Sequence, residues 1–389
     1  MSKTDLIDAI EATREEQIRH LQSFVQTPSL NPPGNTTAAA TVLTNYLSSL
    51  NIPYSIIEPQ TGNPNILSEF NGGKRPGPRV VLNENIDVFP VDNNTDGWTC
   101  DPWSGDLADG RIHGRGVVDM KSGTASLSLR GSVAFLAVSD EETGGRWGTK
   151  YLIAQDKQRW GGDVMLSAEP GQTIRFSERG TLRLSGSVST RGRPWGIFEP
   201  EVKGAIRTAT EILGSVVQSV ESIEPNPPPE IDSYLKDPEV LAAVDKATGP
   251  KTSTIIARPT VNIGTIQGGV KVNMIPDHCT FELDIRLRIR LLAEEVLAVI
   301  HSLIKEHPDA KIEIAMQEAA SNPASFSTIS HPIIEHTNPH YRYAGVPAYV
   351  YGCSPLTMAF VNESASVDEF VHVTKVLALA TWDFLQHET

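Results

Sequence analysis

Three short apolar runs in the first half of the chain have the length and composition of buried β-strands. They cover residues 80–82, 133–138 and 164–166. Each run leads directly into polar and acidic residues, which mark the end of the predicted strand. Open α/β sheets place their chemistry at the carboxyl ends of their strands, so we expect a functional site at this edge of the sheet.

Apolar residues recur at helical intervals in three other segments, which predicts helices beside this sheet. These segments are 4–26, 36–50 and 368–387. Thr4 or Asp5 is the expected cap of the first helix. Parallel strands are usually linked by a helical crossover of a dozen or more residues. Too few residues separate Gly123 from the next strand for a full helix, so a short helix or none is expected there.

A second region, residues 181–323, changes pattern and predicts the order strand, helix, strand, strand, helix, strand. That βαββαβ order is typical of a ferredoxin-like sandwich. The sequence therefore predicts an α/β protein with two domains. Residues 1–180 plus 324–389 form a mixed sheet flanked by helices, and residues 181–323 form an inserted ferredoxin-like α+β domain.

Acidic residues follow the predicted strands and a glycine-rich turn. The candidates are Asp87, Asp119, Glu141, Glu142 and Glu169. Carboxylates that several strands bring to one edge of a sheet can hold a cation or transfer protons. Like charges at short range cannot all ionise, so without a cation at least one of these groups is expected to hold its proton.

The order of these segments resembles the zinc aminoacylase, acetylornithine deacetylase and carboxypeptidase G family of metallopeptidases. The motifs are Asn-Glu-Asn-Ile-Asp-Val at 83–88, Gly-Arg-Gly-Val-Val-Asp-Met-Lys at 114–121, Asp-Glu-Glu-Thr-Gly-Gly at 140–145 and Ala-Glu-Pro at 168–170. The resemblance spans nearly the whole chain. It implies a zinc-exopeptidase-like catalytic domain, and it implies that residues 181–323 form a lid and homodimerisation domain.

The resemblance also implies a role for each carboxylate. Asp119 matches the bridging ligand of a di-zinc centre, and Glu142 and Glu169 match its terminal ligands. Glu141 matches the general base, and Asp87 matches the residue that orients the first histidine ligand. Glu141 and Asp87 are therefore the candidate catalytic residues.

The chain departs from the family pattern at its histidines. Asn85 stands where the family has its first histidine, Phe360 or Ala359 where it has its last, and Trp195 where a histidine reaches the substrate carbonyl. Family segments are also missing after Gly123 and between residues 337 and 341, through true deletions or gene-model errors.

The expected substrate-binding residues are these replacements together with two residues of the inserted domain, namely Asn85, Trp195, Asn273, Arg286 and Phe360. In the family, the positions of Asn273 and Arg286 are associated with the substrate carboxylate. A structural ion pair is the other interpretation of Arg286. Aromatic side chains at 195 and 360, if they face the cavity, would make it more apolar.

The missing histidines change the expected cofactor. Only oxygen donors remain, and zinc prefers nitrogen or sulfur ligands, whereas oxygen-only sites suit magnesium, calcium or manganese. We therefore expect no metal or a weakly held divalent cation, and not the two zinc ions of the family.

Composition limits the partners. A net charge of -14 over 389 residues argues against nucleic acid or an anionic membrane as a partner. Three cysteines without a paired spacing indicate a reducing compartment and no disulfide framework. No signal peptide or membrane span is recognisable. We expect a cytoplasmic protein that acts on a small molecule.

Three functions remain open. The first is a repurposed biosynthetic enzyme that uses carboxylate acid/base chemistry on a small metabolite, for cyclisation, elimination, isomerisation or condensation. The second is a metal-dependent amide-bond hydrolase, a deacylase or peptidase. The third is a pseudoenzyme that only binds a ligand, and the presence of Glu141 speaks against it.

Overall fold

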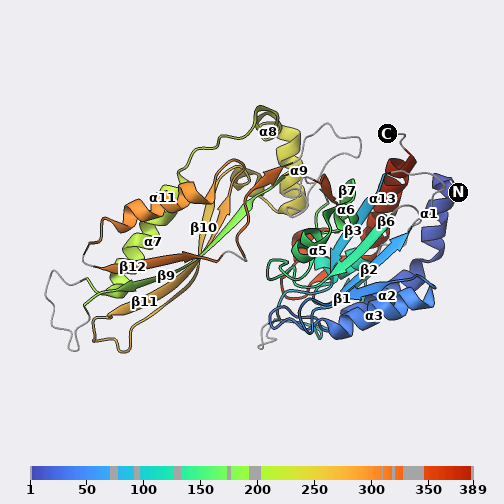
Figure 1. Ribbon diagram of the computed structural model, residues 1–389, viewed down its shortest axis with the longest axis horizontal. Coiled ribbons are helices and arrows are strands. Elements are labelled where there is room, and N and C mark those ends of the chain that lie inside the picture. Colours follow the sequence, from blue (N-terminus) through green and yellow to red (C-terminus); the bar gives the residue numbers. More distant parts are fainter. Residues whose placement is uncertain are drawn as a thin grey trace. The chain divides into compact units, whose positions relative to one another are not determined.

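The computed structural model describes residues 2–70, 78–91, 97–125, 133–172, 177–191, 203–308, 310–317, 320–326 and 346–386 (Figure 1). The chain divides into two compact units. The first unit contains the residues up to Ser177 and from Phe326 onward, with Ala243–Gly249. The second unit contains Glu178–Ala242 and Pro250–Ser325.

A mixed six-stranded sheet forms the centre of the first unit. Its order is β1 (Ser55–Ile57), β2 (Asn65–Phe70), β6 (Val133–Val138), β3 (Val80–Asn85), β7 (Val164–Ser167) and β14 (Ala348–Val350). The last four strands pair in parallel, and β1 and β2 pair antiparallel. The described residues also form two small sheets, namely β15 (Ser364–Ser366) with β5 (Arg111–His113) and β4 (Leu107–Ala108), and β13 (Ser325–Phe326) with β8 (Ser177–Glu178).

Both faces of the central sheet are buried, which explains its continuous apolar runs. On one face, Leu82, Phe135 and Leu166 belong to a core that includes side chains of α1, α2, α3 and α13. On the other face, Val81 and Leu136 pack with side chains of α5 and α6. These helices are α1 (Lys3–Ala12), α2 (Arg14–Val25), α3 (Thr37–Ser49), α5 (Thr149–Gln155), α6 (Lys157–Gly161) and α13 (Val367–Gln386).

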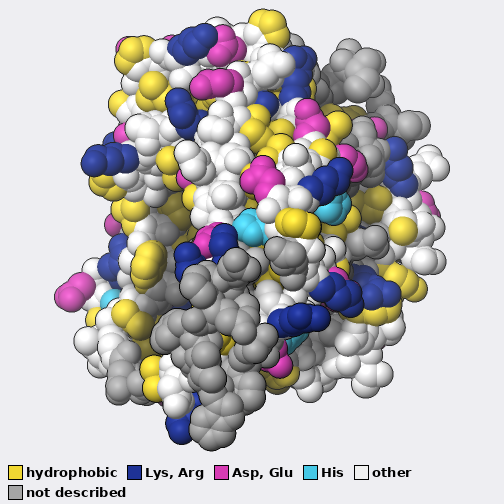
Figure 2. All heavy atoms as spheres, turned by 90° about the vertical axis from the view of Figure 1, so that its left-hand side faces the viewer, with side chains coloured by type: hydrophobic (Ala, Val, Ile, Leu, Met, Phe, Trp, Pro, Cys, Tyr) yellow, Lys and Arg dark blue, Asp and Glu magenta, His cyan; other side chains and the backbone are white. Residues whose placement is uncertain are grey.

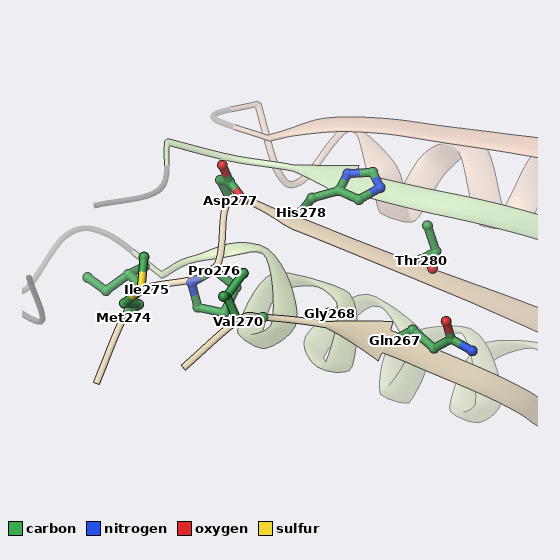
Figure 3. Close-up of a pocket in the computed structure, with 10 residues that line it drawn as sticks. Gln267, Gly268, Val270, Met274, Ile275, Pro276, Asp277, His278 and Thr280 are labelled. Carbon is green, nitrogen blue, oxygen red and sulfur yellow. The ribbon is translucent and has the colours of Figure 1, made fainter. Parts of the chain in front are cut away.

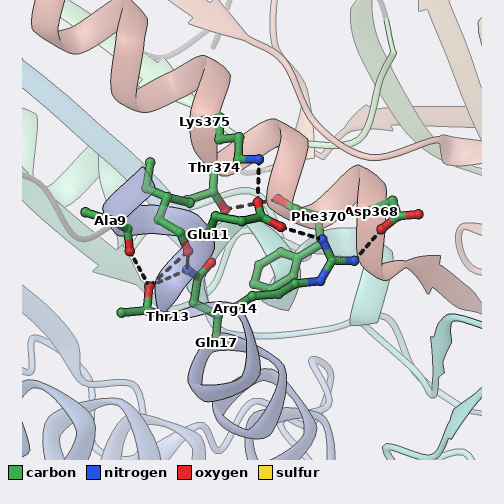
Figure 4. A network of polar contacts seen from close by, with 10 residues as sticks. Ala9, Glu11, Thr13, Arg14, Gln17, Asp368, Phe370, Thr374 and Lys375 are labelled. Carbon is green, nitrogen blue, oxygen red and sulfur yellow. Dashed lines mark hydrogen bonds and ion pairs between the residues drawn. The ribbon is translucent and has the colours of Figure 1, made fainter. Parts of the chain in front are cut away.

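The segment predicted as one helix over 4–26 is two helices that meet at Thr13. The hydroxyl of Thr13 donates to the carbonyls of Ala9 (3.2 Å) and Ile10 (3.1 Å), and it accepts from Gln17 Nε2 at 2.8 Å (Figure 4). A side chain that bonds back to the preceding turn competes with the helical ladder. The predicted cap was also wrong, because Ser2 is the N-cap and Asp5 closes its capping box.

A polar network joins these first helices to α13 (Figure 4). Arg14 pairs with Glu11 at 3.2 Å and with Asp368, and Lys375 pairs with Glu11 at 2.5 Å. Exposed pairs of this kind contribute about 0–1 kcal/mol each. The network therefore links the first helices to α13 but is a minor contribution to stability beside the buried core.

His20 makes the stability of the first unit dependent on pH. Its ring stacks on Tyr46 with ring centroids 3.8 Å apart, and among the described residues its buried Nε2 has no hydrogen-bond partner. Burial lowers its pKa from 6.5 to about 4. The unfolded chain therefore binds a proton between these two pKa values and the folded chain does not, so stability falls as pH falls through this window.

We expect the His20→Phe variant, which keeps the stacked ring, to lose this pH dependence. Between about pH 7.5 and about pH 4.5, wild type should lose about 2.5 kcal/mol of unfolding free energy relative to the variant. Urea titrations of both proteins at the two pH values measure the difference. Parallel pH curves would contradict a buried neutral imidazole.

The second unit is a four-stranded antiparallel sheet with two long helices. The strands are β9 (Gly180–Ser189), β10 (Thr260–Gly268), β11 (His278–Leu287) and β12 (Lys311–Met316), in the order β10-β11-β9-β12. Alternate side chains of β11, such as Phe281 and Ile285, are buried in a core with α7 (Ala205–Glu221) and α11 (Ala293–Ile304). This confirms the predicted βαββαβ order.

Three helices between α7 and β10 were not predicted. They are α8 (Pro229–Tyr234), α9 (Pro238–Thr248) and α10 (Thr252–Ile255). The lid role of this unit and the homodimer expected through it stay predictions.

On the face shown in Figure 2, side chains of both charge signs are interspersed with apolar ones. None of the helices that the structure describes combines the length and apolar character needed to cross a membrane. Cys100, Cys279 and Cys353 are free thiols in the structure.

Candidate active site

The carboxyl ends of β3, β6 and β7 meet at one edge of the central sheet. The three strands are parallel, and Leu82 pairs with Phe135 on one side and with Leu166 on the other. The chain therefore delivers Asp87, the Glu141-Glu142 pair and Glu169 to the same edge, because each follows its strand within a few residues. The predicted convergence of the strand ends is observed.

Asp119 reaches this edge on the glycine-rich turn. The turn leads through the irregular helical turn η1 (Val117–Lys121) into α4 (Ser122–Ala125). The short or missing helix predicted after Gly123 falls on residues 126–132, which lie outside the described residues. Gly116 has φ 76°, and a Cβ there would lie 2.1 Å from Val88 Cγ1, so only glycine fits. Thr124 Oγ1 donates to the carbonyl of Asn85 at 2.8 Å, which connects the turn to the end of β3.

Asp87 holds the Glu141-Glu142 turn in place. Its buried carboxylate accepts hydrogen bonds from the main-chain N–H groups of Glu141 (3.2 Å) and Glu142 (3.0 Å), and from Asn31 Nδ2 (2.9 Å). Burial raises the pKa of Asp87, and these neutral donors oppose the shift. The resemblance assigned Asp87 to orienting a histidine at position 85, but here Asn85 donates to the main-chain oxygen of Asp87 at 3.1 Å.

Glu142 is buried beside other predicted carboxylates. Its Oε1 is buried and has no hydrogen-bond partner among the described residues. Burial raises the pKa of Glu142 far above its usual value, and the charges of Asp119, Glu141 and Asp87 add to the shift. These four side chains therefore form one electrostatically linked group, in which burial and the neighbouring charges favour the protonated form of Glu142.

Two buried carboxyls that the sequence analysis did not single out support this group. Glu84, on β3, accepts hydrogen bonds from the end of β7, and the charge of Glu169 adds to its raised pKa. Glu363 accepts from Arg115 Nη1 at 2.6 Å and from the main-chain N–H of Val118 at 3.0 Å. The available signal for Glu84 was a carboxylate shortly after the apolar run 80–82, between two asparagines, whereas nothing in its sequence surroundings marks Glu363.

Lys121 fixes the far side of the glycine-rich turn. The fully buried ammonium donates to the carbonyls of Phe24 (2.8 Å) and Thr27 (2.7 Å) at the end of α2. It also lies 5.0 Å from the centre of the Phe24 ring. Burial lowers the pKa of Lys121 to about 7. This side chain therefore anchors the turn that bears Asp119 to the helical layer.

The expected substrate-binding residues are more scattered. Asn85 is buried at the end of β3, whereas Phe360 is 68% exposed, which gives no support to an enclosed apolar wall at that position. Arg286, on β11, pairs with Asp284 at 3.0 Å, as the structural interpretation predicts. Asn273 is exposed between β10 and β11, and Trp195 lies outside the described residues.

A cavity of about 550 Å³ lies in the second unit, between the end of β10 and the start of β11 (Figure 3). It is lined by Gln267, Gly268, Gly269, Val270, Met274, Ile275, Pro276, Asp277, His278 and Thr280. None of the five predicted carboxylates lines it. The predicted site at the sheet edge of the first unit and this cavity are therefore formed by different residues.

The residues of this site do not fit a pair of zinc ions. Within the described parts of the chain, no three histidine, cysteine, aspartate or glutamate side chains are arranged to hold a metal ion. The candidate ligands Asp119, Glu142 and Glu169 also offer oxygen atoms only, whereas zinc prefers nitrogen and sulfur. The expectation of no metal, or of a weakly held divalent cation, stays a prediction.

A mixed sheet flanked by helices, with carboxylates gathered at its strand ends, is the architecture of a peptidase-like hydrolase. The chain belongs to Peptidase family M20/M25/M40, which it matches over residues 81–383. The family resemblance drawn from the motifs is thereby confirmed. The assignment of Asn85 and Phe360 to histidine positions stays a prediction.

Two relatives are succinyl-diaminopimelate desuccinylases. The one from Methylorubrum extorquens is 30% identical over 219 residues, which is 49% of this chain and 55% of the relative. The chain thus matches little more than half of that relative's length. The one from Hydrogenovibrio crunogenus is 27% identical over 313 residues, which is 75% of this chain and 73% of the relative.

Solved structures share the fold. The dipeptidase Dug1p from Saccharomyces cerevisiae has a TM-score of 0.77 at 16% identity, covering 100% of this chain and 99% of its own. Human carnosine dipeptidase 1 has a TM-score of 0.75 at 18% identity, covering 99% and 100%. At these identities the likeness supports the α/β fold and not a shared activity.

Proposed function

We propose that this protein is an amide-bond hydrolase acting on a small N-acylated amino acid or dipeptide. The observation that carries the proposal is the Glu141-Glu142 pair, which Asp87 holds by two main-chain N–H groups beside Asp119. Membership of the family and the similarity to succinyl-diaminopimelate desuccinylases support hydrolysis. The repurposed chemistry that the sequence analysis placed first receives less support.

The two glutamates suit the general-base and general-acid steps of a hydrolysis. Glu141, as the carboxylate, takes a proton from the water whose oxygen bonds to the amide carbon. Glu142, kept protonated by burial, gives its proton to the leaving nitrogen as the carbon–nitrogen bond breaks. One water is consumed, and a carboxylic acid and an amine are released.

A substrate panel tests the proposal directly. Purified protein is incubated with N-succinyl and N-acetyl amino acids and with dipeptides, and the products are identified by mass spectrometry. We expect at least one class to gain the mass of one water and split into acid and amine. If every member of the panel is recovered intact, amide hydrolysis is wrong for this chain.

The histidine-free donor set favours a second candidate, acid/base chemistry on a metabolite without hydrolysis. The two candidates differ in the mass balance of a metabolite-extract incubation. Isomerisation and cyclisation without loss of water leave the mass unchanged, elimination and condensation expel a small molecule, and hydrolysis adds water. A product of unchanged mass that forms only with active protein would favour this second candidate.

Metal content tests the role of the carboxylates. Because the donors do not fit a zinc pair, elemental analysis should find well under one zinc per chain, and hydrolysis should persist after dialysis against a chelator. Two bound zinc ions would contradict the carboxylate mechanism. Activity that disappears on chelation and returns with one added divalent metal would also contradict the carboxylate mechanism. The assignment as a hydrolase would stand in that case.

A further inference from the structure

Three buried carboxyl groups in the first unit, those of Asp87, Glu84 and Glu363, share one arrangement. Each of the three accepts a hydrogen bond from a main-chain N–H of a candidate carboxylate or of the residue just before one. Asp87 does so for Glu141 and Glu142. Glu84 and Glu363 repeat the arrangement, and the hydrolysis described above makes no direct use of either.

Glu84 holds the turn that carries Glu169. The main-chain pairing of β3 with β7 ends at Leu82 and Leu166, just before the site. Beyond that point the Glu84 side chain connects β3 to the chain that follows β7, because Glu84 Oε1 accepts a hydrogen bond from the Ala168 N–H at 2.9 Å. Its Oε2 accepts from Ser167 Oγ at 3.3 Å, and that hydroxyl accepts from the Glu169 N–H at 3.2 Å.

Glu363 holds the turn that carries Asp119. Its carboxylate accepts from the N–H of Val118, the residue before Asp119, at 3.0 Å. The same carboxylate accepts from Arg115 Nη1 at 2.6 Å, and its main-chain oxygen accepts from the Gly114 N–H at 2.9 Å. A segment that directly precedes β15 therefore contacts this turn at three positions.

We propose that Glu84 and Glu363 are positioning residues, which hold the turns presenting Glu169 and Asp119 by accepting main-chain N–H groups. The kinetic part of this inference rests on the proposed hydrolysis. A main-chain donor needs an acceptor oxygen and not a charge, so a neutral carboxyl serves equally well. An amide oxygen at position 84 should therefore replace the carboxylate, whereas an aliphatic side chain should not.

The test compares Glu84→Gln with Glu84→Leu. The turn that carries Glu169 lies at the same sheet edge as the Glu141-Glu142 pair, and a misplacement of about 1 Å caused by a change away from the reacting groups can cost about 100-fold in rate. We therefore expect Glu84→Leu to lower kcat by about that factor, with KM within about twofold, and Glu84→Gln to stay within about threefold of wild type. Hydrogen exchange of the peptide spanning residues 164–170 should accelerate about tenfold or more in the leucine variant only, because the Ala168 N–H loses its acceptor.

Ser167→Ala provides a second test if the leucine variant does not fold. It removes only the hydroxyl that links Glu84 to the Glu169 N–H, so exchange in the same peptide should again accelerate. For Glu363, the double variant Arg115→Met with Glu363→Leu leaves no unpaired charge. Its exchange should accelerate over residues 114–121.

Two results would overturn the inference. One is normal exchange and normal kcat in Glu84→Leu. The other is a glutamine variant as impaired as the leucine variant, which would show that the charge matters and the acceptor does not. If wild type hydrolyses no amide, the proposed function fails, but the exchange measurements still decide whether Glu84 and Glu363 hold their turns.

Discussion

Replacing Glu141 by glutamine is expected to lower kcat for amide hydrolysis by at least about 100-fold, because an amide cannot take the proton of the attacking water. The substitution should leave the turn intact, since Asp87 binds the main-chain N–H of Glu141 and not its side chain. Release of free amine from the best panel substrate, followed at saturating concentration, measures the effect.

The matched control is Glu294→Gln, which makes the same chemical change on an exposed residue of α11. It should have wild-type kcat and KM. Hydrolysis that is undiminished in Glu141→Gln would remove the general base from the mechanism. If neither wild type nor variant hydrolysed any panel substrate or turned over any other metabolite, only the ligand-binding pseudoenzyme would be left.

The elements that the sequence predicted well are those with a strong local pattern. The strand β6 is apolar at nearly every position because both faces of the sheet are covered, and β11 alternates because only one of its faces packs on helices. The break at Thr13 was missed because helical spacing continues across it, and only the hydroxyl's bonds to Ala9 and Ile10 reveal it. Strands of two or three residues, such as β4 and β15, are too short to show a period.

The sequence could predict those residues of the candidate site that lie within recognisable sequence motifs. Each predicted carboxylate follows a strand or a glycine turn, so motif order was enough to find them. Glu363 could not be found in this way, because its partner Arg115 lies 248 positions away in the chain. The hydrogen bonds of Asp87 to the Glu141-Glu142 turn could not be predicted from the sequence either. Their donors are main-chain N–H groups, which any residue type at positions 141 and 142 other than proline would supply.

Replacing Arg115 by methionine is expected to lower the free energy of unfolding by about 3–5 kcal/mol, the usual cost of breaking a buried ion pair. The side chains of Arg115 and Glu363 are only 5% and 1% exposed, and their atoms are 2.6 Å apart. Without the guanidinium, the Glu363 carboxylate keeps the Val118 N–H as a donor but loses its balancing charge. Urea titration followed by circular dichroism measures the loss.

Arg14→Met is the matched control, because Arg14 also pairs with carboxylates but is 30% exposed and its partners Glu11 and Asp368 are 46% and 85% exposed. Water screens such a pair, so the control should cost no more than about 1 kcal/mol. Adding Glu363→Leu to Arg115→Met removes the unpaired charge and should recover part of the lost stability. Equal losses for Arg115→Met and Arg14→Met would mean that water reaches the Arg115–Glu363 pair, and the turn that bears Asp119 would then lack its rigid support.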